Sequence, residues 1–289
     1  MKNIKAIIFD AYGTLFDVNS AAEKCKSKIG DKWESFANYW RKTQLEYTWL
    51  RSLMGRHKDF WQITEDSLDK SIQAFNIDKA MKNELLDLYR ILSPYPEVKE
   101  TLEKLKEKKY KLAILSNGTP SLLNELVKSN DLQNLFDDIF SIEEVKIYKP
   151  SSKVYDMPIK KYNIKHEEVA FLSANTWDVS GGGNYGFSSV WVNRNKNIFD
   201  NLDYKPKNEI RMGTMLLAGS LSGLISGAAG VGGPPFVTAL MARNESAERT
   251  RSNIILSLNS MSLLTTANYF YSGLVTINLV LLSLTLVPF

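Results

Sequence analysis

The chain has 289 residues, of which 44% are hydrophobic and 24% are charged, as in globular proteins with room for one large domain or two smaller ones. Its 36 Lys and Arg against 32 Asp and Glu give a net charge of +4, which is too little basic excess to indicate a nucleic-acid partner. One cysteine, Cys25, excludes an internal disulfide framework, and two histidines without a partner pattern, His57 and His166, exclude a histidine-rich metal site.

Short apolar runs bounded by turn residues predict buried strands. They lie at residues 5–9, 111–115, 138–142, 169–172 and 189–192. Helical patterns alternate with them, at residues 96–108, 120–129 and 153–162. Fully apolar runs of this length are typical of parallel strands that helices cover on both faces. We therefore expect an α/β fold with a doubly wound, Rossmann-like parallel sheet.

The segment between the first two strands contains no convincing strand. Residues 21–92 instead show several helical patterns rich in Trp, Leu and Lys. We expect residues 19–92 to form a helical cap over the carboxyl ends of the strands, where active sites of such sheets lie. The α/β catalytic core would then consist of residues 1–18 and 93–205.

Charged residues are missing from two long stretches near the end of the chain. Residues 212–242 and 252–289 contain no Asp, Glu, Lys or Arg, and a charged loop, RNESAERTR, separates them. Uncharged apolar stretches of about 18 residues or more are candidates for membrane helices. We expect residues 206–211 to be a linker and residues 212–289 to form a helical transmembrane tail, with the catalytic domain on the cytoplasmic side.

Polar side chains follow the predicted strands at their carboxyl ends. Asp10 ends the first strand within FDAYGTLFD, Ser116 and Asn117 follow the second, Lys149 follows the third, and SANTWD follows the fourth. Taken alone, each residue is explained as well by a turn or a surface charge. Because the carboxyl ends of parallel strands meet at one edge of a sheet, the set together predicts a catalytic site. A carboxylate at the end of a buried strand is placed to act as a nucleophile.

An Asp, a Ser, a Lys and a later Asp in this order resemble the motifs of the haloacid dehalogenase superfamily. Phosphatases of that superfamily carry DxDxT in the first motif and two acidic residues near the fourth strand for magnesium, a cation that prefers several oxygen ligands. This chain has Tyr12 in place of the second Asp, and SANTWD offers only Asp178. Both departures resemble the type II L-2-haloacid dehalogenases, as do the cap segment YWRKTQLEYTWLRSLMG (residues 39–55), LSNG and YKP.

The resemblance covers nearly all of residues 1–205 and implies hydrolysis of L-2-haloacids to D-2-hydroxyacids through an aspartyl ester, without metal or cofactor. Asp10 would attack C2 of the substrate, Lys149 would keep Asp10 ionised, Arg41 would stabilise the departing halide, and Asp178 would activate the water. The implied catalytic residues are Asp10, Thr14, Arg41, Lys149, Ser173, Asn175 and Asp178. The implied substrate contacts are Tyr12, Arg41, Leu45, Phe60, Ser116, Asn117, Tyr155 and Trp177.

Two alternatives remain open. One is a magnesium-dependent phosphatase of the same superfamily, against which Tyr12 and the missing second acid count. The other is a membrane transport protein with an accessory soluble domain, because the tail, with GVGGPP at residues 230–235, resembles part of a repeat of the sulfite-exporter (TauE-type) permeases. The expected partners are a small 2-haloacid, the membrane and, from the resemblance, a second copy of the chain. If the tail is a fusion without function, we expect a cytoplasmic protein.

Overall fold

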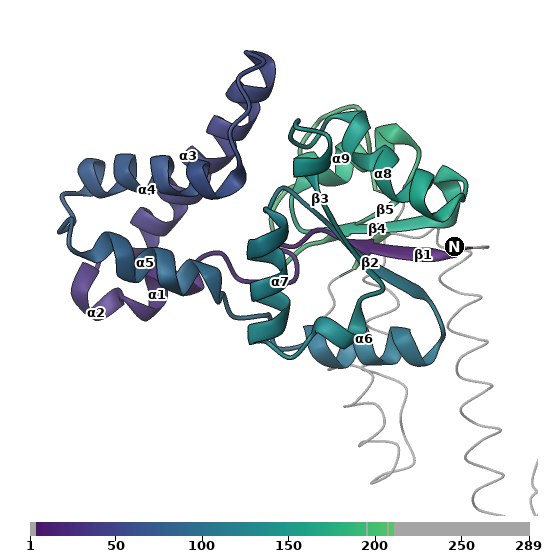
Figure 1. The fold of residues 1–289 in the computed structure, drawn as a ribbon, viewed down its shortest axis with the longest axis horizontal. Helices are drawn as coiled ribbons and strands as arrows, with labels where there is room; N and C mark the ends of the chain where they lie inside the picture. The colour runs from purple at the N-terminus through teal and green to yellow at the C-terminus, as the bar shows by residue number, and fades with distance from the viewer. Residues whose placement is uncertain (1–3, 195, 207, 211–289) are drawn as a thin grey trace, which may run out of the picture. The chain divides into compact units, whose positions relative to one another are not determined.

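A six-stranded parallel sheet lies at the centre of the part of the chain that the structure, a computed structural model, describes: residues 4–194, 196–206 and 208–210. Its spatial order is β3-β2-β1-β4-β5-β6, and every neighbouring pair is parallel (Figure 1). The strands are β1 (Ala6–Phe9), β2 (Lys111–Ser116), β3 (Asp138–Ser141), β4 (Val169–Ser173), β5 (Ser188–Val192) and β6 (Asn208–Ile210). The predicted α/β parallel sheet is confirmed.

The five predicted strands are present, and each end lies within one residue of its prediction. Strands β1, β4 and β5 are buried along their whole length, which is why their sequences are continuous apolar runs rather than alternating ones. Strand β6 was not predicted, and it lies within residues 206–211, which the sequence indicates as a linker. It pairs with β5 through its backbone, and an edge strand of three residues needs no apolar run to do so.

Helices cover both faces of the sheet. They are α6 (Val98–Glu107), α7 (Pro120–Ser129), α8 (Ser152–Tyr162) and α9 (Thr176–Tyr185). The chain moves outward from β1 through β2 to β3, and in the other direction from β4 to β5. Because crossovers between parallel strands are right-handed, this reversal places α6 and α7 on one face and α8 and α9 on the other, as Figure 1 shows.

A group of helices between β1 and β2 stands beside the sheet (Figure 1). They are α1 (Ser20–Lys24), α2 (Lys26–Ile29), α3 (Trp33–Leu53), α4 (Phe60–Phe75) and α5 (Met81–Arg90). We call this group the cap. Its two connections to the sheet run side by side, because Asp17 N donates to Ser93 O (2.8 Å) and Tyr95 N donates to Leu15 O (3.0 Å). The loop after Asp10 is therefore paired with the segment that returns from the cap.

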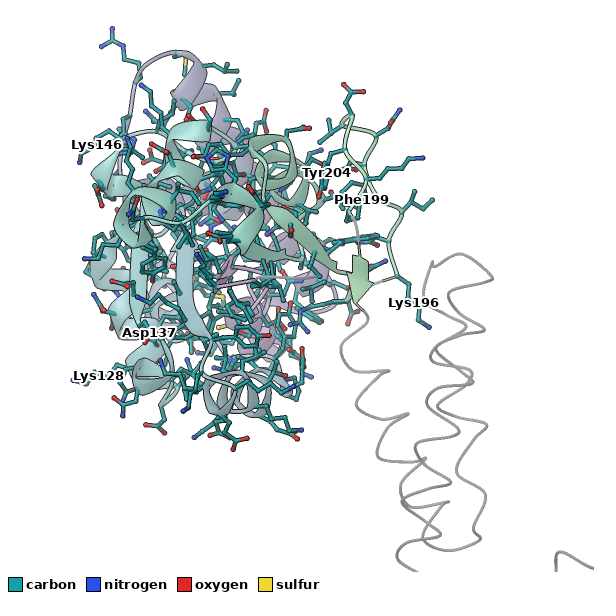
Figure 2. All side chains as sticks on the ribbon, turned by 90° about the vertical axis from the view of Figure 1, so that its right-hand side faces the viewer. Lys128, Asp137, Lys146, Lys196, Phe199 and Tyr204 are labelled. Atoms are coloured by element: carbon teal, nitrogen blue, oxygen red, sulfur yellow. The ribbon has the colours of Figure 1, made fainter. Side chains whose placement is uncertain are left out.

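The segment after β5 packs against the core. Phe199 and Tyr204, both labelled in Figure 2, mark its course. The ring of Phe199 lies edge-on to Trp191 of β5, with 5.1 Å between ring centroids. Tyr204 lies so close to Gly183 of α9 that a Cβ atom at Gly183 would overlap its ring. Residues 196–204 are thus part of the catalytic-core fold rather than a free connection.

The predicted transmembrane tail, residues 212–289, lies outside the described residues. In the part of the chain that is described, no helix combines the length and the apolar character that a membrane crossing needs.

Candidate active site

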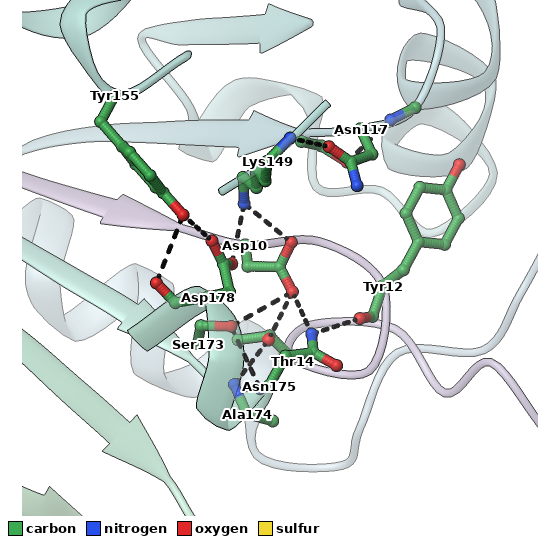
Figure 3. A network of polar contacts seen from close by, with 12 residues as sticks. Asp10, Tyr12, Thr14, Asn117, Lys149, Tyr155, Ser173, Ala174, Asn175 and Asp178 are labelled. Carbon is green, nitrogen blue, oxygen red and sulfur yellow. Dashed lines mark hydrogen bonds and ion pairs between the residues drawn. The ribbon is translucent and has the colours of Figure 1, made fainter. Parts of the chain in front are cut away.

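The carboxylate of Asp10 lies at the carboxyl end of β1 and is held by four donors (Figure 3). Its Oδ2 accepts hydrogen bonds from Thr14 Oγ1 at 2.9 Å and from Asn175 Nδ2 at 2.8 Å. Ser173 Oγ lies 3.5 Å from the same oxygen, and Lys149 Nζ donates to Oδ1 at 3.1 Å. Asp10 is only 5% exposed. Three neutral donors thus converge on one carboxylate oxygen, and an ammonium binds the other.

A tight turn after Asp10 returns Thr14 to the carboxylate. Gly13 adopts φ +86°, a left-handed conformation that favours glycine, and its N–H donates to Phe16 O at 2.8 Å. Thr14 Oγ1 accepts a hydrogen bond from Ala174 N at 2.8 Å, so its own proton is directed to Asp10. The hydroxyl is therefore oriented by the first residue after β4.

Lys149 links the two carboxylates of the site. Its Nζ lies 3.1 Å from Asp10 Oδ1 and 2.9 Å from Asp178 Oδ2, and the side chain is fully buried. Burial alone would lower the pKa of Lys149, but Asp10 and Asp178 together outweigh it and raise that pKa above its usual value. The ammonium therefore stays charged throughout the physiological pH range.

Asp178, at the start of α9, is fully buried. Burial raises the pKa of its carboxyl group to about 6, against the opposing charge of Lys149. Tyr155 OH donates to Asp178 Oδ1 at 2.8 Å. Burial and the Asp178 charge raise the pKa of Tyr155 well above its usual value, so the phenol keeps the proton that it donates. Asp178 is thus a carboxylate with a partner on each oxygen and a pKa close to neutrality.

Ser116 and Asn117 hold the turn after β2. Ser116 Oγ accepts from Gly118 N at 3.1 Å, and Asn117 Oδ1 accepts from Lys149 N at 3.2 Å. A Cβ atom at Gly118 would lie 2.9 Å from the ring of Tyr12, so glycine allows this ring to approach the turn. Both predicted residues lie at the expected edge of the sheet, and their contact with a substrate stays a prediction.

Arg41 brings the cap to the Asp10 loop. From α3, its Nη2 donates to the carbonyl oxygen of Tyr12 at 3.3 Å, and Asn175 Nδ2 donates to the same oxygen at 3.2 Å. In Figure 3 the ring of Tyr12 points away from Asp10 while its carbonyl group faces Asn175. The Tyr12 ring stacks on Tyr89, with 5.7 Å between centroids and 17° between planes. The structure thus brings the predicted Arg41 to the site.

The remaining predicted pocket residues differ in burial. Phe60 is fully buried and packs against the rings of Tyr12 (5.1 Å) and Tyr148 (6.5 Å). Trp177 is partly buried and lies edge-on to Trp49 of α3, with 5.4 Å between centroids. Leu45 is partly buried on α3. Whether these three side chains contact a substrate stays a prediction.

Three contacts of the described residues were not predicted. Gln44 accepts from Arg41 Nη1 at 2.9 Å, and its position three residues after Arg41 on one helix could have indicated the contact. Arg194, two residues beyond β5, donates to Thr14 O at 2.5 Å. His57 Nε2 lies 3.0 Å from Glu143 Oε2, which links the loop between α3 and α4 to the core. No sequence signal indicates this last pair, because its members are 86 positions apart.

The donor set does not fit a magnesium ion of the kind that phosphatases of this superfamily use. The two carboxylates, Asp10 and Asp178, already share the ammonium of Lys149. The carbonyl oxygen of Tyr12 already accepts two hydrogen bonds. Within residues 4–194, 196–206 and 208–210, no three His, Cys, Asp or Glu side chains gather as metal ligands.

The chain is similar to known proteins over most of its described part. Residues 4–186 match the family described as haloacid dehalogenase-like hydrolase. The (S)-2-haloacid dehalogenase of Pseudomonas fluorescens is 39% identical over 213 residues, which cover 73% of this chain and 94% of that protein. The (S)-2-haloacid dehalogenase 1 of Pseudomonas sp. strain CBS-3 is 43% identical over 196 residues, covering 67% and 86% of the two chains. The solved structure of the Xanthobacter autotrophicus L-2-haloacid dehalogenase with chloropropionic acid covalently bound has a TM-score of 0.62 and 38% identity, and it covers 66% of this chain and 78% of that one.

Proposed function

The chain belongs to the haloacid dehalogenase-like hydrolases, and we propose that it hydrolyses the carbon–halogen bond of L-2-haloacids to give D-2-hydroxyacids. The observation that carries the proposal is the contact of Lys149 Nζ with both Asp10 and Asp178. The ammonium of Lys149 lies between the carboxylates of Asp10 and Asp178 and binds both of them. The relatives named above supply the substrate class, since two of them are (S)-2-haloacid dehalogenases.

In the first step Asp10 attacks C2 of the substrate, and halide departs with inversion. We assign the attack to Oδ1, because Oδ2 accepts from Thr14, Asn175 and Ser173 whereas Oδ1 accepts from Lys149. Halide leaves as an anion and needs no proton, so Tyr12 can stand where phosphatases carry an acid. Arg41 supplies positive charge to the leaving halide. The related structure with covalently bound chloropropionic acid supports an ester intermediate.

In the second step water attacks Cγ of Asp10 and the ester bond breaks. The developing negative charge falls on Oδ2, where three donors are already in place. Asp178 takes the proton of the attacking water as a general base. Once Asp10 is an ester its charge is gone, and one of the influences that raise the pKa of Asp178 disappears. Asp178 is therefore ionised when it must accept a proton.

The leaving oxygen in this second step is Oδ1, which departs with the product as its hydroxyl group. Lys149 Nζ contacts Oδ1, stabilises the negative charge that develops there and gives the leaving oxygen its proton. Lys149 recovers a proton from Asp178, which took it from the attacking water and lies 2.9 Å from Nζ. Product oxygen comes from Asp10, and the oxygen of water enters the Asp10 carboxylate.

The experiment that tests the proposal measures halide release by the full-length chain from each enantiomer of 2-chloropropionate, with a chelator present. Release from the L enantiomer only is the expected result. Phosphatase activity that appears on adding magnesium, without halide release, would instead support the alternative reaction.

For residues 212–289 the proposal remains attachment to a membrane, which rests on the two uncharged stretches of the sequence. Sedimentation of the full-length chain with lipid vesicles tests it. If the chain stays in the supernatant when vesicles are present, as it does without them, the result would argue against attachment. The sedimentation coefficient of the chain, measured separately, would report whether two copies pair.

A further inference from the structure

The buried amide of Gln44 lies next to Arg41 on helix α3, three positions further along the chain. Gln44 is 1% exposed, and its Oε1 accepts a hydrogen bond from Arg41 Nη1 at 2.9 Å. Residues three positions apart share one face of a helix, so the amide and the guanidinium point in the same direction. The other end of the guanidinium, Nη2, donates to Tyr12 O at 3.3 Å. Arg41 is thus held between the cap and the Asp10 loop.

The orientation of this amide is determined by its other contacts. Thr64 Oγ1 donates its proton to Phe60 O at 2.7 Å, so it can only accept from Gln44 Nε2, which lies 2.7 Å away. Gln44 Nε2 also donates to Tyr89 OH at 3.0 Å. With Nε2 committed to Thr64, Oε1 faces Arg41 Nη1, and it also accepts from Tyr89 OH at 3.3 Å. Contacts with α4 and α5 thus hold the amide of Gln44, on α3, in the orientation in which its Oε1 accepts from Arg41.

The partners of Arg41 are neutral. Three other arginines of the described residues are paired with carboxylates: Arg51 with Asp66, Arg90 with Glu125 and Arg194 with Glu97. Among the described residues, no carboxylate lies within 4.0 Å of the guanidinium of Arg41, which donates to an amide oxygen and a peptide carbonyl and lies close to the phenol of Tyr89. A partly buried cation that is oriented but not neutralised keeps its attraction for an incoming anion.

We propose that Gln44 is a positioning residue, which holds the guanidinium of Arg41 beside the Asp10 site while leaving its positive charge available to the departing halide. This inference rests on the proposed function, because it deepens the role of Arg41 in carbon–halogen cleavage. A carboxylate at position 44 would orient Arg41 as well, but it would neutralise the charge. An apolar side chain would leave the charge but release the guanidinium.

The test uses Gln44→Met and Gln44→Glu in the full-length chain. Ser71→Ala is the matched control, because Ser71 is a buried polar residue of the same cap whose hydroxyl donates to Ser67 O. Single-turnover halide release is measured with L-2-chloropropionate and L-2-bromopropionate. We expect both Gln44 variants to lose about tenfold or more with the chloro substrate and less with the bromo substrate, because the poorer leaving group needs the positioned charge more.

A double-substitution cycle separates positioning from general damage to the cap. In an Arg41→Lys background, Gln44→Met should cause little further loss, because the group that Gln44 orients is already gone. Equal losses for both leaving groups, or a full additional loss in the Arg41→Lys background, would overturn the inference. So would wild-type rates in both Gln44 variants.

Bromide binding provides a readout that does not depend on turnover. Calorimetric titration with sodium bromide should show weaker binding to Gln44→Met and to Gln44→Glu than to the wild type and to Ser71→Ala. If the wild type releases no halide from either substrate, the proposed function fails, and bromide binding still decides the inference. Equal bromide affinity in all four proteins would then reject the role of Gln44.

Discussion

Lys149 and Asp178 form an ion pair at 2.9 Å in which neither side chain is exposed to solvent. A buried pair of this kind is stabilising only if its remaining hydrogen-bonding groups are satisfied. Here Tyr155 OH occupies Asp178 Oδ1, and Asp10 accepts a second hydrogen bond from Lys149 Nζ. The pair therefore places a base and an ammonium on the same side of the Asp10 carboxylate, which is what the second step of the proposed reaction requires.

Replacing Asp10 with Asn should abolish halide release. The amide keeps the size of the side chain but loses the nucleophilic oxygen, and its NH₂ group would face either the three donors on Oδ2 or the ammonium of Lys149. Halide release and the unfolding temperature are measured together. Activity in a folded Asp10→Asn preparation that is free of wild-type enzyme would contradict the nucleophile assignment.

Replacing Asp178 with Asn should allow ester formation but slow ester hydrolysis by about 100-fold or more, because general-base catalysis is lost. Mass spectrometry of the protein after one turnover with L-2-chloropropionate should then show an adduct on Asp10. The wild type serves as the control and should show little adduct at steady state. Absence of any adduct in a variant that still releases one equivalent of halide would exclude Asp178 as the base.

The fate of the water oxygen should show independently whether water attacks Cγ of the Asp10 ester or C2 of the substrate. A single turnover of excess enzyme in ¹⁸O-labelled water should place the label in Asp10, and the hydroxyl group of the product should remain unlabelled. Direct attack of water on C2 would give the opposite distribution. Digestion and mass spectrometry of the peptide that contains Asp10 distinguish the two routes.

The decay of the ester should lose rate at acid pH. Burial raises the pKa of Asp178 to about 6, and a general base is active only when it is deprotonated. Loss of the Asp10 charge in the ester lowers the Asp178 pKa. The rate of ester decay should therefore begin to fall at or below about pH 6 and then drop about tenfold per pH unit, which gives the pH–rate profile an acid limb. Ester decay followed from pH 4 to 8 measures this limb. In the Asp178→Asn variant the limb should disappear, and its persistence there would assign it to another group.

Much of the site could be predicted because its residues follow strands that are visible as apolar runs. Asp10, Ser116 and Ser173 are placed by β1, β2 and β4, and parallel strands bring their carboxyl ends together. The same rule fails for β6, whose residues Asn208–Ile210 carry no apolar run of strand length. It also cannot find contacts between distant segments, such as Arg194 with Thr14 across 180 positions. Gln44 was missed for a different reason: its spacing from Arg41 allows the contact, but a glutamine in the sequence does not show that its amide is buried.

Arg194 is expected to support the first step through Thr14. Its Nη2 donates to Thr14 O at 2.5 Å, its guanidinium lies 3.6 Å from the centre of the Tyr95 ring, and it forms an ion pair with Glu97. Tyr95 and Glu97 belong to the segment that returns from the cap, so one side chain connects that segment to the Asp10 loop. Because the hydroxyl of the same Thr14 holds Asp10 Oδ2, loosening Thr14 should misalign the nucleophile.

Arg194→Gln should therefore slow single-turnover halide release by about tenfold, a loss comparable to that of one hydrogen bond to a charged group. Glu97→Gln is the matched control, because it removes the ion pair while Arg194 keeps its contact with Thr14. Both variants should lower the unfolding temperature, whereas only Arg194→Gln should slow the reaction. Equal rates in the two variants would mean that Arg194 contributes to stability alone, and that the turn at Gly13 holds Thr14 in place without it.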